Sequence, residues 1–424
     1  MGVSRRNVIG VAGAVGAAGV LAGAACEPQQ RGPAPPLDPQ NWDSVRAQFG
    51  LDPGLTHLAS FVFASHPAPI QLAIEQHRAA LDRNPIATLD QESTFDIAVA
   101  TAAARYLDTS TDQLAFTDST TMGLGLLYTG LRLGAGDEVL TTEHDFYATH
   151  EALRLRAQRD GVTVRRVKLY DDPAQATVDG IVSRLADAVT ARTKVVAVTW
   201  VHSSTGVRLP IRQIADALRD KGPLLCVDGV HGFGVEDAKP ATLGADFLVS
   251  GCHKWLYGPR GTGLIWGSPE GWARFTPVIP AFDRRVIGAW MGFEAPPAPP
   301  GATATPGGYH SFEHRWALST AFDFHRVIGP DRITARVHQL AALLKEKLAG
   351  VRGVRLITPA DPQLSAGIVC VQVEGRTPEQ VVTRLRGAKV IASVTPYNPS
   401  YLRFGTSIAN NEADVDKAVS ALKG

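Results

Sequence analysis

The sequence is poor in cysteine and has almost no net charge. Its 424 residues include four cysteines, and 42 lysines and arginines balance 41 aspartates and glutamates. Four scattered cysteines give neither a disulfide framework nor the ligand spacing of a zinc site, and Cys226 and Cys370 stand in apolar runs as small hydrophobes do. A chain without a basic excess offers no electrostatic surface for nucleic acid. We therefore expect no bound metal and no nucleic-acid partner.

Apolar runs that end in polar turns alternate with helical segments through residues 110–266. This alternation predicts a mostly parallel sheet that is covered on both faces. Polar residues that directly follow such strands lie at their carboxyl ends, where cofactors bind in sheets of this kind. The chain is long enough for a large core, which we expect to be divided between two subdomains.

The stretch of residues 224–266 carries the chemistry. Its first apolar run, residues 224–227, ends on Asp228, and its second, residues 246–249, leads through a short turn to Lys254. Short apolar runs bounded by glycine and proline are typical of buried strands. One carboxylate therefore stands at one strand end, and one lysine stands just beyond the next.

This pairing suits pyridoxal 5'-phosphate, which needs a lysine for its Schiff base and an acidic partner for its pyridinium nitrogen. The carboxylate keeps the ring nitrogen protonated, so that the ring can accept the electrons of a substrate carbanion. Alone, Lys254 could be a surface lysine and Asp228 a helix cap or turn residue. Together, beside apolar strands and with His253 and Trp255 flanking the lysine, they predict a cofactor site.

The segments VDGVHGFG (227–234) and SGCHKWLYGPRGTG (250–263) resemble the class V aminotransferase family of fold-type I pyridoxal-phosphate enzymes. This family includes cysteine desulfurases, kynureninase, isopenicillin N epimerase and the ergothioneine-pathway C–S lyase. The resemblance covers residues 50–420. It implies an α/β fold with a mostly parallel seven-stranded sheet in a large domain, a smaller α+β C-terminal domain, and a homodimer with active sites at the subunit interface.

The expected division of the chain follows from composition and from this resemblance. The sequence predicts a signal peptide over residues 1–26 and a proline-rich, disordered linker over residues 27–40. A large cofactor-binding domain is expected over residues 41–294 and a small C-terminal domain over residues 309–424. Residues 295–308, which are rich in proline and glycine, are expected to form a loop between the two.

The N-terminal residues predict a targeting segment rather than a part of the fold. Arg5 and Arg6 precede a run rich in alanine and glycine, which resembles a bacterial twin-arginine export signal. A transmembrane anchor, the alternative, needs a longer and more apolar run. Because this export route carries folded proteins, it suits an enzyme that takes up its cofactor before transport. We expect a periplasmic or secreted protein that engages the twin-arginine machinery, and cleavage near residues 22–24 or a lipid on Cys26 are both left open.

Residues 114–131 predict the binding site for the cofactor's phosphate. An apolar strand end runs into a polar turn at residues 118–121, and an apolar helix follows. Amide groups and the dipole at a helix N-terminus favour a phosphate, and hydroxyl groups add donors. An ordinary N-cap is the alternative. Because Thr120 and Thr121 also match the family's phosphate turn, we expect them to bind the phosphate.

Phe146 and Ser203 follow two further apolar runs. The resemblance implies that Phe146 stacks on the pyridine ring, with His144 in this role if the register shifts, and core packing is the alternative for Phe146. The family also places a polar side chain near the ring oxygen of the cofactor, where this chain has Ser203. Cysteine desulfurases have asparagine there, so turn formation is an equal alternative for Ser203.

Three more residues near the lysine resemble cofactor contacts of the family. His231 corresponds to a position that hydrogen-bonds the ring oxygen, and His253 is expected near the phosphate or the Schiff base. Ser250 resembles the family's phosphate-binding serine, although it stands one residue further from the lysine than in cysteine desulfurases. For both histidines, a structural role in the core is the alternative.

The C-terminal part contributes the expected substrate contact. The segment 401–414 resembles a family ending in which an arginine, here Arg403, holds the substrate α-carboxylate through a planar, bidentate match. Upstream, Arg315 stands where family members contact the phosphate of the partner subunit through a Gly-Thr pair that this chain lacks. Arg315 either replaces that contact or forms a surface ion pair.

Together these residues predict a pyridoxal-phosphate enzyme that acts on an amino acid or an amine. Lys254 is expected to form the Schiff base and then to act as the general base on the α-proton. Transamination, epimerisation and β-elimination are left open, although residues 388–402 lack the mobile cysteine that cysteine desulfurases need. The alternative is a non-catalytic, exported binding module. Such a module predicts loss of the lysine, the aspartate or the phosphate turn, and the sequence retains all three.

Overall fold

The structure, a computed structural model, describes residues 35–423. The expected signal peptide with its twin arginine, Cys26, and most of the expected linker lie outside the described residues. Contacts join the described residues from Pro36 onward into one unit. Among the described residues, no helix is both long and apolar enough to cross a membrane.

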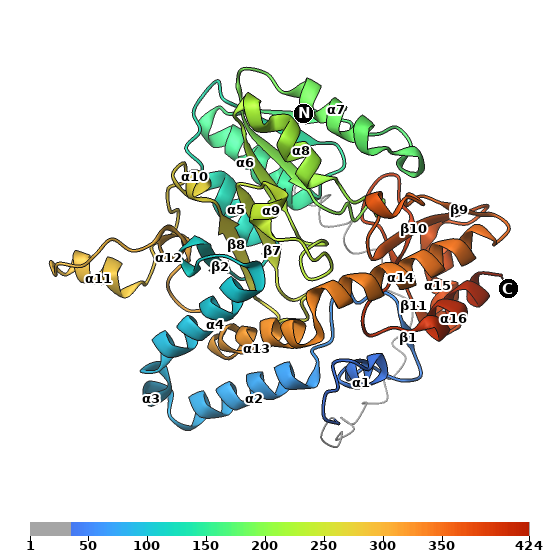
Figure 1. The fold of residues 1–424 in the computed structure, drawn as a ribbon, viewed down its shortest axis with the longest axis horizontal. Coiled ribbons are helices and arrows are strands. Elements are labelled where there is room, and N and C mark those ends of the chain that lie inside the picture. Colours follow the sequence, from blue (N-terminus) through green and yellow to red (C-terminus); the bar gives the residue numbers. More distant parts are fainter. Residues whose placement is uncertain (1–34, 424) are drawn as a thin grey trace, which may run out of the picture. The chain divides into compact units, whose positions relative to one another are not determined.

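Seven strands form the central sheet in the order β2-β8-β7-β6-β5-β3-β4 (Figure 1). β8 is antiparallel to both of its neighbours, whereas the other strands run in one direction. The expected mostly parallel, seven-stranded sheet is therefore confirmed. The strands are β2 (Leu114–Thr117), β3 (Glu138–Thr142), β4 (Thr163–Val167), β5 (Thr193–Thr199), β6 (Leu224–Asp228), β7 (Phe247–Gly251) and β8 (Gly263–Gly267).

The inner strands are apolar on both faces, as a sheet that is covered on two sides requires. Every residue of β6 and β7 is buried, whereas no residue of the edge strand β4 is. This difference explains why β6 and β7 stand out in the sequence as continuous apolar runs.

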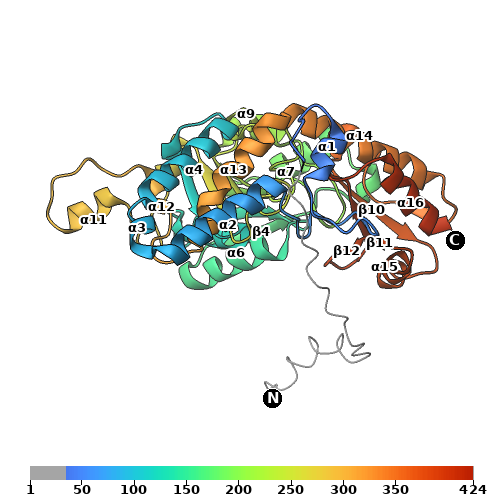
Figure 2. The same ribbon diagram turned by 90° about the horizontal axis from the view of Figure 1, so that it is seen from below.

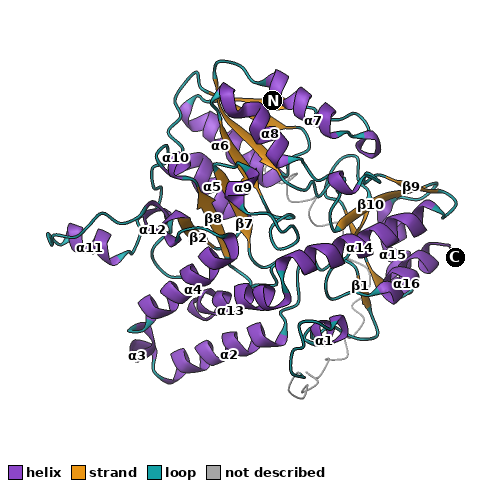
Figure 3. Cartoon of the chain, viewed as in Figure 1, coloured by secondary structure: helices purple, strands orange, loops and turns teal. Residues whose placement is uncertain are grey.

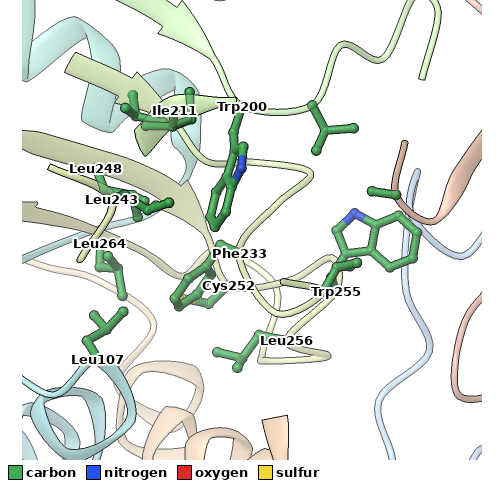
Figure 4. Packing of buried hydrophobic residues seen from close by; sticks show 14 of the residues in the cluster. Leu107, Trp200, Ile211, Phe233, Leu243, Leu248, Cys252, Trp255, Leu256 and Leu264 are labelled. Atoms are coloured by element: carbon green, nitrogen blue, oxygen red, sulfur yellow. The ribbon is translucent and has the colours of Figure 1, made fainter. Parts of the chain in front are cut away.

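Helices cover both faces of the sheet (Figure 3). They include α2 (Ala68–Arg83), α3 (Pro85–Leu89), α4 (Glu92–Leu107), α5 (Thr120–Gly130), α6 (Tyr147–Asp160), α7 (Val178–Ala188), α8 (Ile211–Leu218), α9 (Pro240–Leu243) and α10 (Pro269–Trp272). Val249 packs into a core that contains the leucines of α5, on one face. Leu248 and Leu264 pack into a second core with Leu107 and Ile211, on the other face (Figure 4).

The amphipathic pattern of α8 shows how the sequence produces this layering. Ile211, Ile214 and Leu218 recur at three- and four-residue spacing and are buried. A helix with such a spacing presents one apolar stripe, which stabilises it only against another apolar surface. The second core of the sheet provides that surface.

A second, smaller sheet is formed by the C-terminal part of the chain. It is antiparallel, in the order β12-β13-β10-β9, and it packs with helices, so the expected α+β part is confirmed. Its elements are α14 (Pro330–Ala349), β9 (Val354–Leu356), β10 (Ile368–Val373), α15 (Pro378–Gly387), β12 (Ser393–Val394), β13 (Leu402–Gly405) and α16 (Glu412–Lys423).

The N-terminal segment of the described chain joins this C-terminal part. β1 (Thr56–His57), which follows α1 (Trp42–Ala47), pairs in parallel with β11 (Val390–Ile391). The backbone amide of Gly405 also donates a hydrogen bond to the carbonyl of Leu58. Residues after β1 are therefore held against β13, next to Arg403.

The segment of residues 295–308 contains more structure than the loop that the sequence predicts. Its residues 300–304 form the helix α12, which packs against β2. The hydroxyl of Thr305 caps this contact by accepting a hydrogen bond from the backbone amide of Phe116, at 3.1 Å. Proline at the first position of α12 and threonine directly after the helix favour this short helix. The high proline and glycine content of the segment does not by itself predict it.

Two helices flank this segment. α11 (Arg284–Trp290) precedes it and projects away from the other elements, as two views show (Figures 1 and 2). α13 (Phe312–Ile328) follows it and packs along α2 and α4. The first helix after the expected boundary at residue 309 is thus packed on helices from the N-terminal half of the chain.

Candidate active site

A cavity of about 250 Å³ lies at the carboxyl ends of β5, β6 and β7. Every predicted site residue except Ser250 lines it. These residues are Thr120, Thr121, Phe146, Ser203, Asp228, His231, His253, Lys254 and Arg403. The sheet brings them together because parallel strands end at one edge, so that turns far apart in the sequence meet there.

One end of the cavity is formed by the N-terminus of α5. Ser119 caps this helix by accepting a hydrogen bond from the amide of Met122, at 3.1 Å. The hydroxyl of Thr120 accepts a hydrogen bond from the amide of Gly251, at 2.7 Å, which ties the helix to the end of β7. Thr121 is exposed at the mouth. A helix N-terminus with two hydroxyl groups beside it can bind an anion.

Asp228 and Lys254 are buried ionisable groups on the wall of the cavity. Asp228 is the last residue of β6, and its carboxylate accepts a hydrogen bond from the amide of Val230, at 3.0 Å. Burial raises the pKa of Asp228 to about 7, although the nearby Lys254 opposes this shift. Burial lowers the pKa of Lys254 to about 8, with Asp228 opposing and Arg403 assisting. The lysine can therefore lose its proton near neutral pH.

His231 lies between the lysine and a cluster of aromatic rings. The indole of Trp255 donates a hydrogen bond to Nδ1 of His231, at 3.2 Å. Nδ1 is therefore an acceptor, and the neutral ring carries its proton on Nε2. Burial keeps the ring neutral, because it lowers the pKa of His231 well below its usual range. The ring of Phe61 stacks on Trp255 with centroids 5.9 Å apart.

Arg403 forms the opposite end of the cavity from α5. Its guanidinium lies 4.7 Å from the ring centroid of Phe61 and donates hydrogen bonds to Ser393 Oγ and to the carbonyl of Ser203, at 3.1 and 3.0 Å. Nη2 of Arg403 also donates to the carbonyl of Val394, at 3.5 Å. These three hydrogen bonds fix the plane of the guanidinium and leave two of its five N–H groups for a ligand. A planar cation in this position can bind a carboxylate.

Phe146 and Ser203 share a neighbour that the sequence did not single out, Tyr397. The hydroxyl groups of Tyr397 and Ser203 are 2.8 Å apart, and the ring of Tyr397 meets that of Phe146 edge-on, with centroids 5.9 Å apart. In the sequence, Tyr397 lies within residues 388–402, which differ from cysteine desulfurases by the lack of a cysteine. No sequence pattern marked the tyrosine itself. His144, the alternative to Phe146, stacks on Tyr170 instead and does not line the cavity.

Two further predictions fare differently. Ser250 points away from the cavity: its side chain is fully buried in β7 and its hydroxyl donates to the carbonyl of Gly251, at 3.0 Å. In β7 Ser250 directly follows Val249, which packs towards α5, so the side chain of Ser250 points to the opposite face of the sheet. Arg315 lines a different cavity, where its guanidinium lies 4.2 Å from the ring centroid of Phe116.

The residues of the cavity fit pyridoxal phosphate. An anion site, a buried carboxylate and a lysine with a lowered pKa stand at separate positions on its wall. The hydroxyl of Thr199, also in the lining, is buried and has no hydrogen-bond partner among the described residues. Buried polar groups rarely stay unpaired, so Thr199 indicates a polar ligand here. No group of three or more histidine, cysteine or acidic residues is placed to hold a metal within residues 35–423.

A comparison with protein-family models identifies one match. The model described as aminotransferase class-V matches residues 75–417 of this chain. The match spans the central sheet, the lysine turn and most of the C-terminal part.

Named relatives and solved structures agree with this match. Isopenicillin N epimerase of Amycolatopsis lactamdurans is 26% identical over 397 residues, which cover 90% of this chain and 98% of the relative. A probable cysteine desulfurase of Xylella fastidiosa is 28% identical over 375 residues, which cover 83% and 85%. A C-DES mutant with glycine covalently linked to its PLP cofactor has a TM-score of 0.82 at 20% identity, and the alignment covers 89% of this chain and 98% of that one.

Proposed function

Because this chain belongs to the class V aminotransferase family, whose members use pyridoxal phosphate, we propose that it is a pyridoxal-phosphate enzyme that removes the α-proton of an amino acid or amine. The observation that carries the proposal is that Lys254, Asp228 and Arg403 line one cavity. When bound, the cofactor supplies an electron sink for the carbanion that this step leaves at the α-carbon.

Lys254 is the proposed attachment point and general base. Its pKa of about 8 lets a useful fraction of the amine be neutral at physiological pH, and a neutral amine is both a nucleophile and a base. Asp228 is the proposed partner of the ring nitrogen. Because the pKa of Asp228 is about 7, its carboxyl group is partly ionised at neutral pH. A cationic ring beside it would favour the ionised form.

The remaining residues of the cavity bind and orient. Thr120 and Thr121 at the N-terminus of α5 are proposed to hold the phosphate group. Phe146 is proposed to lie on one face of the pyridine ring, and His231, with its proton on Nε2, is a donor for a polar atom of the cofactor. Arg403 is proposed to hold the substrate carboxylate, which fixes the α-carbon in front of the lysine.

Among the reactions open to such a site, we propose epimerisation. The isopenicillin N epimerase relatives align over 90% of this chain. Cysteine desulfuration is disfavoured, because Cys226, Cys252 and Cys370, the cysteines of the described residues, are all buried and none lines the cavity. Transamination and β-elimination of the kind found in a C–S lyase differ from epimerisation because each yields a keto acid. Elimination alone also releases sulfide or persulfide.

The visible absorption spectrum of the purified protein tests the proposal. We expect a band of the bound cofactor, which borohydride abolishes while fixing the cofactor to the protein. Peptide mass spectrometry should then find the adduct on Lys254 and not on Lys345. Lys345 is an internal control, since burial also lowers its pKa to about 8 but it does not line the cavity.

The variant Lys254→Ala should bind the cofactor without a covalent link. A protein with no band after incubation with pyridoxal phosphate would instead support the non-catalytic binding module. Amino acids that shift the band of the wild-type protein would then define the substrate class.

Export is a separate proposal that rests on the N-terminal sequence alone. We propose that the chain leaves the cytoplasm through the twin-arginine machinery, and that it works in the periplasm or outside the cell. Replacement of Arg5 and Arg6 by lysine should retain the protein in the cytoplasm, as cell fractionation would show.

A further inference from the structure

Tyr397 and its partner Ser203 stand on the side of the cavity away from Lys254. Lys254 follows β7, whereas Ser203 follows β5 and Phe146 follows β3. The order of strands along this edge is β7-β6-β5-β3, with Asp228 at the end of the middle strand β6. Since neighbouring strands lie about 4.8 Å apart, β5 and β7 are about 10 Å apart, and the turns that carry Ser203 and Lys254 leave the sheet at these two strands.

The contacts of Tyr397 place its hydroxyl group at this second wall. Its oxygen lies 2.8 Å from Oγ of Ser203, which lines the cavity, and its neighbour Pro396 lines the cavity too. The carbonyl of Ser203 accepts a hydrogen bond from Arg403, at 3.0 Å. The hydroxyl pair therefore stands beside Arg403, the group that is proposed to hold the substrate carboxylate.

The loop that carries Tyr397 is fixed at its base. The amide of Tyr401 donates to Oγ1 of Thr395 and the amide of Thr395 donates to the carbonyl of Tyr401, at 2.8 and 2.9 Å. The hydroxyl of Ser400 donates to the carbonyl of Thr395, at 2.8 Å. These three hydrogen bonds close a short loop between Thr395 and Tyr401. The loop therefore holds the phenol of Tyr397 in one position.

The phenol of Tyr397 is in its proton-bearing form. Burial raises the pKa of Tyr397 well above its usual range, whereas the hydrogen bond with Ser203 opposes this shift. The negative charges of Asp145 and Asp228 also raise this pKa, and Arg403 lowers it. The lining holds further proton-bearing groups, which are Ser119, Thr120, Thr121, Thr199, His231 and His253. Thr120 belongs to the N-terminus of α5, and His231 lies against Trp255, directly after the lysine.

We infer that the Ser203–Tyr397 hydroxyl pair returns a proton to the α-carbon on the face opposite Lys254. The inference rests on the proposed function and explains how the site would invert a stereocentre. Lys254 takes the α-proton on its own face and becomes an ammonium. Ser203 gives its hydroxyl proton to the α-carbon from the other face, and Tyr397 passes its phenolic proton to Ser203. The resulting phenolate gains one proton from water and the ammonium loses one, so the cycle leaves no net change in protons.

Ser203 is the catalytic group in this scheme, because it lines the cavity, and Tyr397 is a positioning residue that acts through it. The variant Tyr397→Phe separates the two steps, since it removes only the hydroxyl and keeps the ring against Phe146. The matched control is Tyr401→Phe in the same loop, because within residues 35–423 the hydrogen bonds of Tyr401 are made by its backbone and Tyr401 does not line the cavity.

The test follows the α-proton and the configuration together. The holoenzyme is incubated with the standard L-amino acids in deuterium oxide, proton NMR records loss of the α-proton signal, and chiral chromatography records the D-isomer. Wild type and Tyr401→Phe should show exchange with inversion. Tyr397→Phe should still exchange the α-proton through Lys254 but lose inversion by about 10²–10⁴-fold, the usual contribution of a general acid.

A binding measurement excludes a merely structural role. The probe is 2-methylalanine, which has no α-proton and whose binding shifts the visible spectrum of the cofactor. Its Kd should stay within about twofold in Tyr397→Phe, in contrast to the inversion rate. Equal loss of exchange and inversion, a Kd raised in parallel, or inversion that survives in Tyr397→Phe would each overturn the inference. A wild-type protein that exchanges no α-proton contradicts the proposed function itself.

Discussion

At the scale of single residues, Asp228 and Lys254 are kept in a state that costs the empty protein stability. The carboxyl group of Asp228 has a pKa of about 7 in the folded state and of about 3.9 in the unfolded state. The folded state therefore binds more protons than the unfolded state. The folded state therefore loses stability as pH rises from about 4 to 7, and the loss is complete above the folded pKa. A cationic cofactor ring would stabilise the ionised carboxylate and so remove this loss of folding stability. The buried carboxylate of Asp228 therefore favours cofactor binding at the expense of the stability of the cofactor-free protein.

The variant Asp228→Asn should accordingly be more stable than the cofactor-free wild type by about 2–4 kcal/mol at pH 8. Asparagine keeps an oxygen for the amide of Val230 but carries no charge. The measurement is urea unfolding of both proteins at several pH values. The difference should shrink as pH falls from 7 towards 4, and a difference that is independent of pH would contradict the explanation. The same variant should bind pyridoxal phosphate more weakly.

Several residues of the cavity could be predicted from the sequence because they stand at or soon after the end of an apolar run. Asp228 is the last residue of β6, and Phe146 follows the end of β3 by four residues. Ser250 does not line the cavity, because it lies one residue after Val249 in β7 and therefore faces away from α5. Tyr397 was not predicted because its partner Ser203 stands far from it in the sequence, and no local pattern marks that contact.

At the scale of elements, Asp145 fastens two strands of the sheet at the edge of the cavity. Its carboxylate accepts hydrogen bonds from Oγ1 of Thr141 and the amide of Thr142 at the end of β3, both at 2.7 Å. Its other oxygen accepts from the amide of Thr199 at the end of β5, also at 2.7 Å. The next residue is Phe146, so this clamp also positions the proposed stacking ring.

Replacement of Asp145 by asparagine should destabilise the protein by about 1–3 kcal/mol, because an NH₂ group would then face donors that require an acceptor. Urea unfolding gives the free energy, and retention of the cofactor during dialysis reports on Phe146. Asp187→Asn is the control, since Asp187 is exposed on α7. Equal stability of the two variants would show that the clamp is dispensable.

The approach of β13 to the loop after β1 is tight enough to test with one methyl group. A Cβ atom at Gly405 would lie 2.0 Å from a ring carbon of Phe61, whose ring faces the guanidinium of Arg403. Gly405→Ala should therefore cost about 1–3 kcal/mol and raise the Kd of 2-methylalanine. The control is Gly387→Ala, where a Cβ atom would meet nothing within 4 Å. An unchanged Kd for Gly405→Ala would mean that Phe61 does not position Arg403.

Elements were predictable where burial is uniform and not where pairing is long-range. The strands β6 and β7 could be read from continuous apolar runs that are buried on both faces. The pairing of β1 with β11 could not, because each has two residues and nothing local specifies a partner near the other end of the chain. The helix α12 was missed since proline and glycine, which open and surround it, are also the residues of loops.

At the scale of the whole molecule, the projecting segment around α11 presents a large apolar surface. Phe282, Trp290, Met291, Phe293 and Tyr309 are each more than half exposed, and Trp290 and Tyr309 reach 84% and 88%. Soluble monomers rarely leave so many large apolar side chains close together in water. The homodimer expected from the family would cover such a surface.

Light scattering on the intact protein tests this expectation. We predict a mass of about twice the chain mass of 45.1 kDa and a shift towards the monomer in Trp290→Glu. Leu155→Glu is the control, because Leu155 is exposed on α6, away from this segment. A wild-type protein with the mass of one chain at micromolar concentration would contradict the prediction.

The parallel pair of β1 and β11 also has a consequence for the making of the protein. During translation, the ribosome releases β1, the phosphate turn, Asp228 and Lys254 well before it adds β11 and Arg403. Until those last residues emerge, Phe61 cannot pack against β13 and Arg403 cannot line the cavity. A nascent chain can therefore complete its large sheet early, but Arg403, the proposed carboxylate-binding residue, joins the cavity only when synthesis is almost finished.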